Sequence, residues 1–341
     1  MANSKIRVIK TLEFDAPDRI PTQLWDLPWA EIYYGKELKK IRTDFPDDLI
    51  FAPDWAINPP KTKGEEYEIG EYTDEWGCIF ENKQNGIVGE VKNPLIQTWD
   101  DAGRVHPPNE LLSLRTEKIN DFCRLNNDKF ILSPCCARPF ERIQFLRGSE
   151  NIYTDFYEHR EEFESLLDTI HNFNCNRLQA WAETDVDALF IMDDWGAQNS
   201  LLISPDMWRE IFKPLYSEYA EIAQNNNKYI FMHSDGHILS IFPDLIEIGI
   251  NAVNSQIFAM GLENLSEFKG KITFWGEVDR QNILPDYERE EVEKTVLKIY
   301  DTLYDNGGII GQCEFGPGAK ADNVYAVFDT WSKVMNKNIA R

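Results

Sequence analysis

The stretch Lys228-Tyr229-Ile230-Phe231-Met232-His233-Ser234-Asp235-Gly236-His237 joins a short apolar run to a polar tip that contains a glycine. A helical pattern of apolar residues follows directly, from Ile238 to Ile246. An apolar run, a polar turn and a helix in this order predict a strand followed by a helix, the repeating unit of parallel α/β folds. Those folds bind ligands at the carboxyl ends of their strands, so His233 and Asp235 occupy a position suited to binding or catalysis.

Seven other apolar runs have the same character, and most of them alternate with helical patterns. Eight such repeats in a chain of 341 residues favour an α/β fold, a closed (β/α)8 TIM barrel that spans residues 1–341 as a single domain. A doubly wound open sheet is the alternative, but it would carry a glycine-rich phosphate loop after an early strand, and the sequence has none. The predicted strands are residues 20–26, 49–53, 130–135, 188–193, 228–233, 250–254, 271–276 and 308–313.

Residues 55–110 interrupt the alternation of predicted strands and helices. Loosely alternating residues in 66–82 and 87–91 flank the turn Gln84-Asn85-Gly86, a pattern typical of a β-hairpin. We therefore expect an inserted hairpin segment near the N-terminal third of the chain. It either covers the barrel mouth as a lid or decorates one edge of the barrel.

The composition excludes several classes of partner. The net charge is −23 and the sequence pI is about 4.6, with no basic stripe of the kind that neutralises nucleic-acid phosphates. The same acidity disfavours an anionic membrane surface, and no apolar run is long enough to span a bilayer. The first ten residues lack the apolar core of a signal peptide, so we expect a cytoplasmic protein. The six cysteines form no CxxC pair and are expected to be reduced thiols.

The residues that follow the predicted strands are rich in metal-ligand types and poor in arginine and lysine. His233 and Asp235 share one tip, and Cys313 ends the last predicted strand, so a barrel could bring all three together. An imidazole, a thiolate and a carboxylate suit Zn²⁺, and three protein ligands leave a fourth position open for substrate. The alternative is a hydrogen-bonded histidine and a small buried cysteine.

Other tip residues are candidates for catalysis or substrate binding. Adjacent acids at a tip can point to opposite sides, so at most one of Asp193 and Asp194 is expected to enter the mouth, and the other can cap a helix. Aromatic residues near the tips could wall a pocket for an apolar or aromatic substrate. The predicted catalytic residues are Asp193, Asp194 and Glu277, and the predicted substrate-binding residues are Trp25, Trp76, Trp195, Gln198 and Asn254.

Several motifs resemble the uroporphyrinogen decarboxylase superfamily, in particular its corrinoid-dependent methyltransferase-like branch. They include residues 16–21 (Ala-Pro-Asp-Arg-Ile-Pro), 192–196 (Met-Asp-Asp-Trp-Gly), 231–236 (Phe-Met-His-Ser-Asp-Gly) and 274–279 (Phe-Trp-Gly-Glu-Val-Asp). The resemblance implies a (β/α)8 barrel and a zinc site built from His-x-Cys and a distant Cys. Those positions fall on His233, Asp235 and Cys313, so an aspartate replaces the first cysteine.

This resemblance implies a zinc-dependent methyltransferase that moves a methyl group to or from a corrinoid on a partner protein. The small-molecule partner is either an O-methyl donor or a thiol acceptor. The family's true decarboxylases use an Arg-rich segment after the first strand, whereas residues 23–29 here contain no arginine. The alternatives are a metal-free decarboxylase or lyase acting on a small carboxylic acid, and a non-catalytic barrel that binds a ligand.

Overall fold

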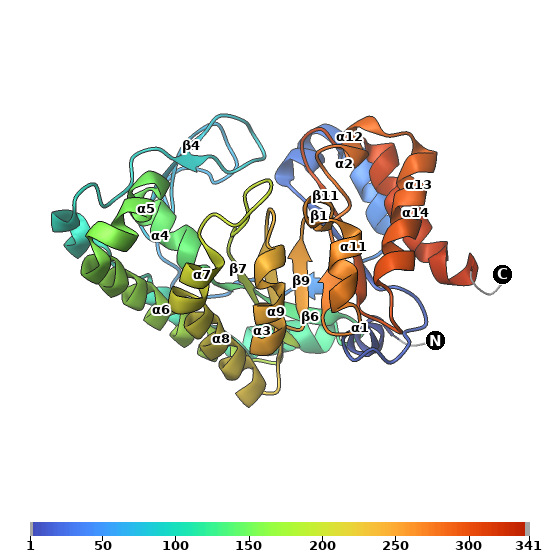
Figure 1. Ribbon diagram of the computed structural model, residues 1–341, viewed down its shortest axis with the longest axis horizontal. Coiled ribbons are helices and arrows are strands. Elements are labelled where there is room, and N and C mark those ends of the chain that lie inside the picture. The colour runs from blue at the N-terminus through green and yellow to red at the C-terminus, as the bar shows by residue number, and fades with distance from the viewer. Residues whose placement is uncertain (1–2, 338–341) are drawn as a thin grey trace.

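The computed structural model describes residues 3–337, and its centre is a barrel of eight parallel strands. Hydrogen bonds join the strands in the order β1-β11-β10-β9-β8-β7-β6-β2, and helices surround them (Figure 1). The predicted (β/α)8 barrel is confirmed, and each predicted strand overlaps an observed one. The strands are β1 (Thr22–Asp26), β2 (Leu49–Phe51), β6 (Phe130–Ala137), β7 (Ala188–Met192), β8 (Tyr229–Ser234), β9 (Ala252–Ser255), β10 (Thr273–Trp275) and β11 (Ile309–Phe315).

Side chains along each strand alternate between two cores, because successive residues of a strand point to opposite faces. Phe190, Phe231 and Trp275 point into the barrel and pack in one interior cluster. Residues of the alternate parity, such as Leu189 and Met232, belong to the outer cluster between strands and helices. Helix α1 (Ser4–Leu12) contributes two residues to the interior cluster and so plugs one end of the barrel.

Helices form the outer layer, and their starts follow ordinary capping chemistry. The Ser204 hydroxyl accepts the N–H of Met207 at 3.2 Å, and Pro205 begins the helix that follows. Within the described residues, no helix has both the length and the apolar character needed to cross a bilayer. The remaining helices are α2 (Pro28–Asp44), α3 (Thr116–Leu125), α4 (Pro139–Arg147), α5 (Ser149–Glu158), α6 (Arg160–Ala182), α7 (Pro205–Ile211), α8 (Lys213–Asn225), α9 (Phe242–Ile248), α10 (Ile257–Met260), α11 (Leu262–Leu265), α12 (Ile283–Asp286), α13 (Arg289–Leu303) and α14 (Ala321–Lys337).

The barrel closes between β1 and β2 with the help of two carboxylates. Asp48 accepts the N–H of Thr22 at 2.8 Å, and Asp47 accepts the N–H of Leu24 at 2.7 Å. Arg19, from the Ala-Pro-Asp-Arg-Ile-Pro motif, pairs with Asp48 at 2.7 Å. The arginine compensates the buried charge of Asp48, so the motif stabilises the barrel seam rather than the mouth.

Residues 55–110 include a small antiparallel sheet, in the order β3 (Gly70–Thr73), β4 (Ile79–Asn82), β5 (Glu90–Val91). Figure 1 shows this sheet at the top of the view, above α4 and α5. The expected hairpin segment is therefore present.

The inserted segment is anchored to two helices that begin near the barrel mouth. Glu75 pairs with Arg142 of α4 at 3.2 Å, and the carbonyl of Gly86 accepts the N–H of Trp29 in α2 at 3.3 Å. Gly86 has φ of 86°, and a Cβ there would lie 2.4 Å from the Trp29 nitrogen, so the turn requires glycine. Because α2 follows β1 and α4 follows β6, the segment bridges separate points around the mouth. That the segment acts as a lid stays a prediction.

Candidate functional site

His233 lies near the end of β8, and its side chain enters the barrel mouth. Phe231 belongs to the interior cluster and Met232 to the outer one, so the alternation along the strand turns His233 inward. The residue is only 7% exposed. A polar ring buried to this degree needs hydrogen-bond partners to compensate for lost water.

Asn254 of β9 orients this ring. It lies opposite His233 in the β8–β9 register, and its Oδ1 is 2.6 Å from His233 Nδ1. The amide nitrogen of Asn254 donates to the carbonyl of Trp275, so Oδ1 is the acceptor and Nδ1 of the histidine carries the hydrogen. His233 Nε2 therefore faces the mouth. We expected Asn254 to bind substrate, and in the structure it orients His233.

Two carboxylates face His233 Nε2. Asp194 Oδ1 lies 3.5 Å from this nitrogen and Asp235 Oδ1 lies 3.8 Å from it. Ligand atoms of the three side chains all lie within 4.8 Å of one another, which is close enough for one cation to contact them together. The structure thus joins a predicted catalytic residue, Asp194, to two predicted metal ligands.

The loops that carry these carboxylates touch through their glycines. A Cβ on Gly196 would lie 2.2 Å from His237 N, and one on Gly236 would lie 2.1 Å from the carbonyl oxygen of Gly196. The N–H of Asp235 donates to Asp194 Oδ1 at 2.9 Å. Side chains at either glycine would push the loops apart, so the glycine shortly after each acid keeps the two carboxylates together.

The carboxylates hold a proton on His233. Burial lowers the pKa of His233, but the hydrogen bond and charge of Asp194 and the charge of Asp235 outweigh it and raise the pKa to about 9. Burial acts to raise the pKa of Asp194, yet the same contact with His233 leaves it below its ordinary value. At neutral pH the mouth therefore contains an imidazolium between two carboxylates. A metal ion binding here would replace that proton.

Arg280 also enters the mouth, although we expected the tips to be poor in arginine. It pairs with Asp235, and its Nη1 lies 2.7 Å from Glu314 Oε1. Its Nε lies 3.8 Å from Glu277 Oε2. Arg280 follows β10 by only a few residues, but the sequence does not reveal that this loop folds back over the neighbouring strand ends.

Glu277 is suited to donate a proton. It is 2% exposed, and burial raises its pKa to about 8, with the charges of Asp235 and Glu314 adding to the effect and Arg280 opposing it. A carboxyl group with this pKa is mostly protonated at pH 7. Within the described residues, Glu277 Oε1 and Asp235 Oδ1 are both buried without a hydrogen-bond partner. Unpaired buried oxygens are costly, which is consistent with a site that a ligand completes.

Asp193, the other predicted catalytic acid of the pair, has a structural position. It is fully buried and accepts the N–H groups of Phe140 and Glu141 at 2.9 and 2.8 Å, at the start of α4. The hydroxyl of Tyr216 donates to it at 2.5 Å. Asp193 therefore caps α4, and Asp194 is the member of the pair that faces His233.

Cys313 is not brought to this cluster. Ile310 belongs to the interior core, so the alternation along β11 turns Glu314 inward and Cys313 outward. The thiol is buried in the outer cluster with residues of α14, and burial raises its pKa well above the usual range. The third ligand beside His233 and Asp235 is therefore Asp194, and not Cys313 as we expected.

The three tryptophans predicted to contact substrate lie in different surroundings. The ring centroid of Trp25 is 5.3 Å from that of His233, so it borders the site. Trp76 lines a separate cavity of about 300 Å³ beneath the inserted segment. Trp195 is fully buried and stacks on Phe140 at 4.1 Å, which makes it a core residue.

Cavities flank the cluster on two sides. One of about 410 Å³ is bordered by Trp25, Phe51, Phe190 and Met192, and its size and largely apolar wall suit a small molecule. A smaller cavity of about 120 Å³ contains the predicted residue Gln198 beside Glu277 and Arg280. The 300 Å³ cavity is lined by three arginines, Arg138, Arg142 and Arg177, together with Cys135, Cys136 and other residues.

The family model described as uroporphyrinogen decarboxylase (URO-D) matches residues 73–334, which is more than half of the chain. The chain belongs to the URO-D family. The resemblance read from the sequence motifs is thereby confirmed at the level of the family.

A solved structure of low sequence identity shares the fold of this URO-D family member, and a second one is less similar. A methyltransferase from Methanosarcina mazei has a TM-score of 0.70 at 16% identity, and the match covers 98% of this chain and 100% of that one. A B12-independent methionine synthase from Shewanella sp. W3-18-1 has a TM-score of 0.47 at 14% identity, covering 94% and 99% of the two chains. No curated protein matches the chain.

Proposed function

We propose that the barrel mouth is the active site of a zinc-dependent methyltransferase. It would transfer a methyl group from an O-methyl donor to the cobalt of a corrinoid carried by a partner protein. The observation that carries the proposal is the buried oxygen of Asp235 that has no hydrogen-bond partner and faces the nitrogen of His233 beside Asp194. Membership of the URO-D family and the barrel shared with a methyltransferase support it.

The donor set fits zinc. Asp194, His233 and Asp235 would offer two oxygens and one nitrogen, and the two carboxylates would balance the charge of a divalent ion. Asn254 supports the fit, because metal-bound histidines usually donate their other ring N–H to an acceptor of this kind. When bound, zinc would supply a Lewis acid that polarises the oxygen of the methyl donor.

Glu277 would serve as the general acid. Transfer of the methyl group to a corrinoid bound by the partner protein would break the carbon–oxygen bond of the donor and leave its electron pair on the oxygen. That oxygen then needs a proton, and Glu277 holds one because burial raises its pKa to about 8. Arg280 lies between Glu277, Asp235 and Glu314, so it would keep the three acidic groups apart in fixed positions.

The aromatic cavity would receive the body of the methyl donor. Trp25 joins this cavity to the ring of His233, and Phe51 and Phe190 extend the apolar wall. Burial of an aromatic ring against these side chains is favourable, whereas a strongly anionic body would meet Asp26, Asp47 and Glu314 in the same lining. We therefore favour methoxy-substituted aromatic compounds as the class of donor.

A thiol acceptor is the weaker alternative. Zinc activates thiols best when other thiolates donate charge to it, and in this cluster two carboxylates take that place. A metal-free decarboxylase or lyase is the other alternative. It would use His233 as an imidazolium, with its pKa of about 9, and Glu277 as an acid without any ion.

The test combines metal content with methyl transfer. The protein, loaded with Zn²⁺, is mixed with reduced cobalamin and a panel of methoxyarenes, and formation of methylcobalamin is followed by its absorption. We expect Asp235→Asn to lose zinc, and Glu277→Gln to keep zinc while transfer slows by about 10²–10⁴-fold. Asp206→Asn is the matched control, because the Asp206 side chain is 96% exposed and is not one of the ligands of the cluster.

Three results would contradict the proposal. The first is an absence of methylcobalamin with every donor while zinc is bound. The second is unchanged zinc content in Asp235→Asn. The third is chelator-insensitive release of CO₂ from a small acid, which would favour the metal-free lyase.

A further inference from the structure

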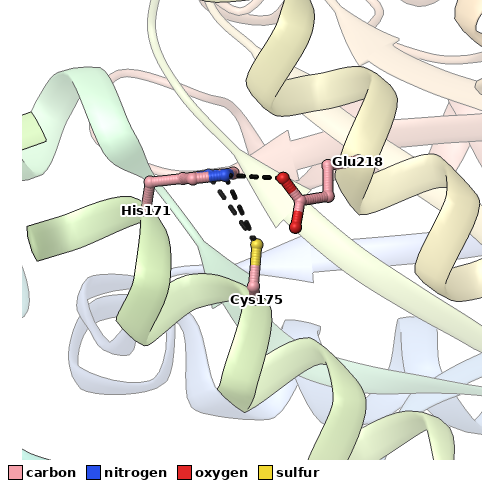
Figure 2. Close-up of side chains that lie close together, drawn as sticks. All are labelled: His171, Cys175 and Glu218. Atoms are coloured by element: carbon pink, nitrogen blue, oxygen red, sulfur yellow. Dashed lines mark hydrogen bonds and ion pairs between the residues drawn. The ribbon is translucent and has the colours of Figure 1, made fainter. Parts of the chain in front are cut away.

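Three potential metal ligands converge on two helices of the outer layer, α6 and α8 (Figure 2). His171 and Cys175 lie four residues apart on α6, so they share one face of that helix. Glu218 reaches toward them from α8, which packs beside α6. Their ligand atoms all lie within 4.8 Å of one another. We propose that His171, Cys175 and Glu218 form a second metal site, for a thiophilic divalent cation such as Zn²⁺.

The distances already approach those of a tetrahedral site. Zinc bonds of about 2.0 Å to nitrogen and 2.3 Å to sulfur place the two ligand atoms about 3.5 Å apart at the tetrahedral angle. The observed separation between Cys175 Sγ and His171 Nε2 is 3.6 Å, but Sγ also lies 3.7 Å from Nδ1, so the thiol has to turn toward the Nε2 side to share an ion with it. Glu218 Oε2 lies 2.9 Å from the same nitrogen and would move back by about 0.5 Å. Its side chain is 54% exposed, so that movement meets little resistance.

A buried tyrosine holds the histidine in the required orientation. The hydroxyl of Tyr219 lies 3.0 Å from His171 Nδ1, and the side chain of Asn174 donates to the same hydroxyl at 3.3 Å. A hydroxyl oxygen has two lone pairs, so it can also accept the N–H of Nδ1 and leave Nε2 free for a metal. An acceptor behind the imidazole is the usual support of a metal-binding histidine.

The thiol gives the site its chemical preference. Burial raises the pKa of Cys175 to about 12, and the charge of Glu218 adds to this. A hard cation such as Mg²⁺ or Ca²⁺ gains little from sulfur, whereas Zn²⁺ binds thiolate strongly enough to displace its proton. The cluster at the mouth contains no thiol, so the two sites differ in a property that spectroscopy can detect.

A metal at this position would fasten α6 to α8. Ligands from two helices bind the ion only in the folded protein, so occupancy stabilises the fold by mass action. The exposed side of Glu218 leaves room for a water molecule as a fourth ligand. The site is therefore expected to be a structural clamp on the outside of the barrel.

The proposal is tested by titrating the metal-stripped full-length protein with Co²⁺ under anaerobic conditions. A thiolate-to-cobalt charge-transfer band should saturate by two equivalents of Co²⁺ per chain, because the barrel mouth takes up one ion without sulfur, and Zn²⁺ should abolish the band by competition. Cys175→Ser should remove the band, and Glu218→Gln should weaken Co²⁺ binding at least tenfold. Cys123→Ser, on the separate helix α3, is the matched control and should keep the band.

Glu218→Gln guards against a folding artefact, since the side chain is largely exposed and circular dichroism will report its fold. Absence of the band in the native protein overturns the proposal and leaves an ordinary ion pair between His171 and Glu218. A band that survives in Cys175→Ser but is lost in Cys313→Ser also overturns it, because the thiolate would then be that of Cys313 and not that of Cys175.

Discussion

Replacing Glu277 with glutamine should flatten the pH dependence of the protein's stability. Burial raises the pKa of Glu277 to about 8 from its ordinary value of 4.5. Between these two values the folded protein holds a proton that the unfolded chain releases. The stability contributed by the protonated group is fully present below pH about 4.5 and is lost as the pH rises through about 8.

The magnitude follows from the size of the shift. Each pH unit is worth about 1.36 kcal/mol per proton, so the interval from 4.5 to about 8 corresponds to at most about 5 kcal/mol. Relaxation around the charged form lowers this ceiling, and we expect a loss of about 2–5 kcal/mol. Glutamine has nearly the same shape and cannot ionise, so the Glu277→Gln protein should lack this loss.

The assay is the free energy of unfolding by denaturant at pH 5, 6, 7 and 8, with a chelator present. The difference in the free energy of unfolding between the native protein and Glu277→Gln reports the titration of Glu277 alone, because the other titrating residues are common to both proteins. Glu263→Gln is the control, since a hydrogen bond from Lys298 lowers the pKa of Glu263 and moves its titration below this range. If the free energy of unfolding changes with pH by the same amount in the native protein and in Glu277→Gln, the reasoning is refuted.

Three further predictions concern the mouth, the inserted segment and the core. Asn254→Ala should weaken Zn²⁺ binding by about 10–100-fold in a calorimetric titration, because His233 loses the acceptor that orients its ring. Gly86→Ala should loosen the inserted segment and speed its cleavage by protease, since a Cβ there would lie 2.4 Å from a backbone nitrogen of α2. Gly103→Ala, where a Cβ meets nothing within 4 Å, should leave cleavage unchanged. Trp195→Ala should lower the free energy of unfolding by about 3–5 kcal/mol, because this side chain is fully buried.

The barrel could be predicted from the sequence because its strands are nearly continuous apolar runs separated by turns and helices. Such runs identify strands even when their ends are uncertain by a residue or two. The closure of the barrel could not be predicted in the same way. Asp47 and Asp48 bridge β1 and β2 by accepting backbone N–H groups, and nothing local in the sequence distinguishes them from surface acids.

The uncertainty of the predicted strand ends explains which site residues could be predicted from the sequence and which could not. His233 and Asp235 follow an apolar run that ends clearly, and the structure places both at the mouth. The last strand was predicted to end at residue 313, which made Cys313 a tip residue, but β11 continues to Phe315. Within a strand the parity of a residue decides its direction, and at position 313 it points to the helices. Arg280 escaped prediction because only the folded loop brings it to Asp235.

The charge balance of the mouth links the metal cluster to the proton of Glu277. Without a metal, the positive charge of His233 lies between Asp194 and Asp235, and Arg280 pairs with Asp235 and Glu314. Binding of Zn²⁺ would exchange one proton on His233 for two positive charges, a net gain of one. Added positive charge favours the ionised form of a nearby carboxyl group, so it lowers the pKa of Glu277 from about 8 toward neutrality.

Zinc should therefore narrow the pH interval over which the free energy of unfolding falls because of Glu277. The unfolding series is repeated with Zn²⁺ in place of the chelator, and the native protein is again compared with Glu277→Gln. Zinc binding stabilises both proteins, so any change in the difference reports how much more tightly the ion binds when Glu277 is ionised than when glutamine takes its place. We expect that difference to level off at a lower pH and at a smaller value than without metal. If the pH interval is the same with and without zinc, the ion binds too far from Glu277 to change its pKa. The proposal that zinc and Glu277 act together on one substrate at the mouth would then be wrong.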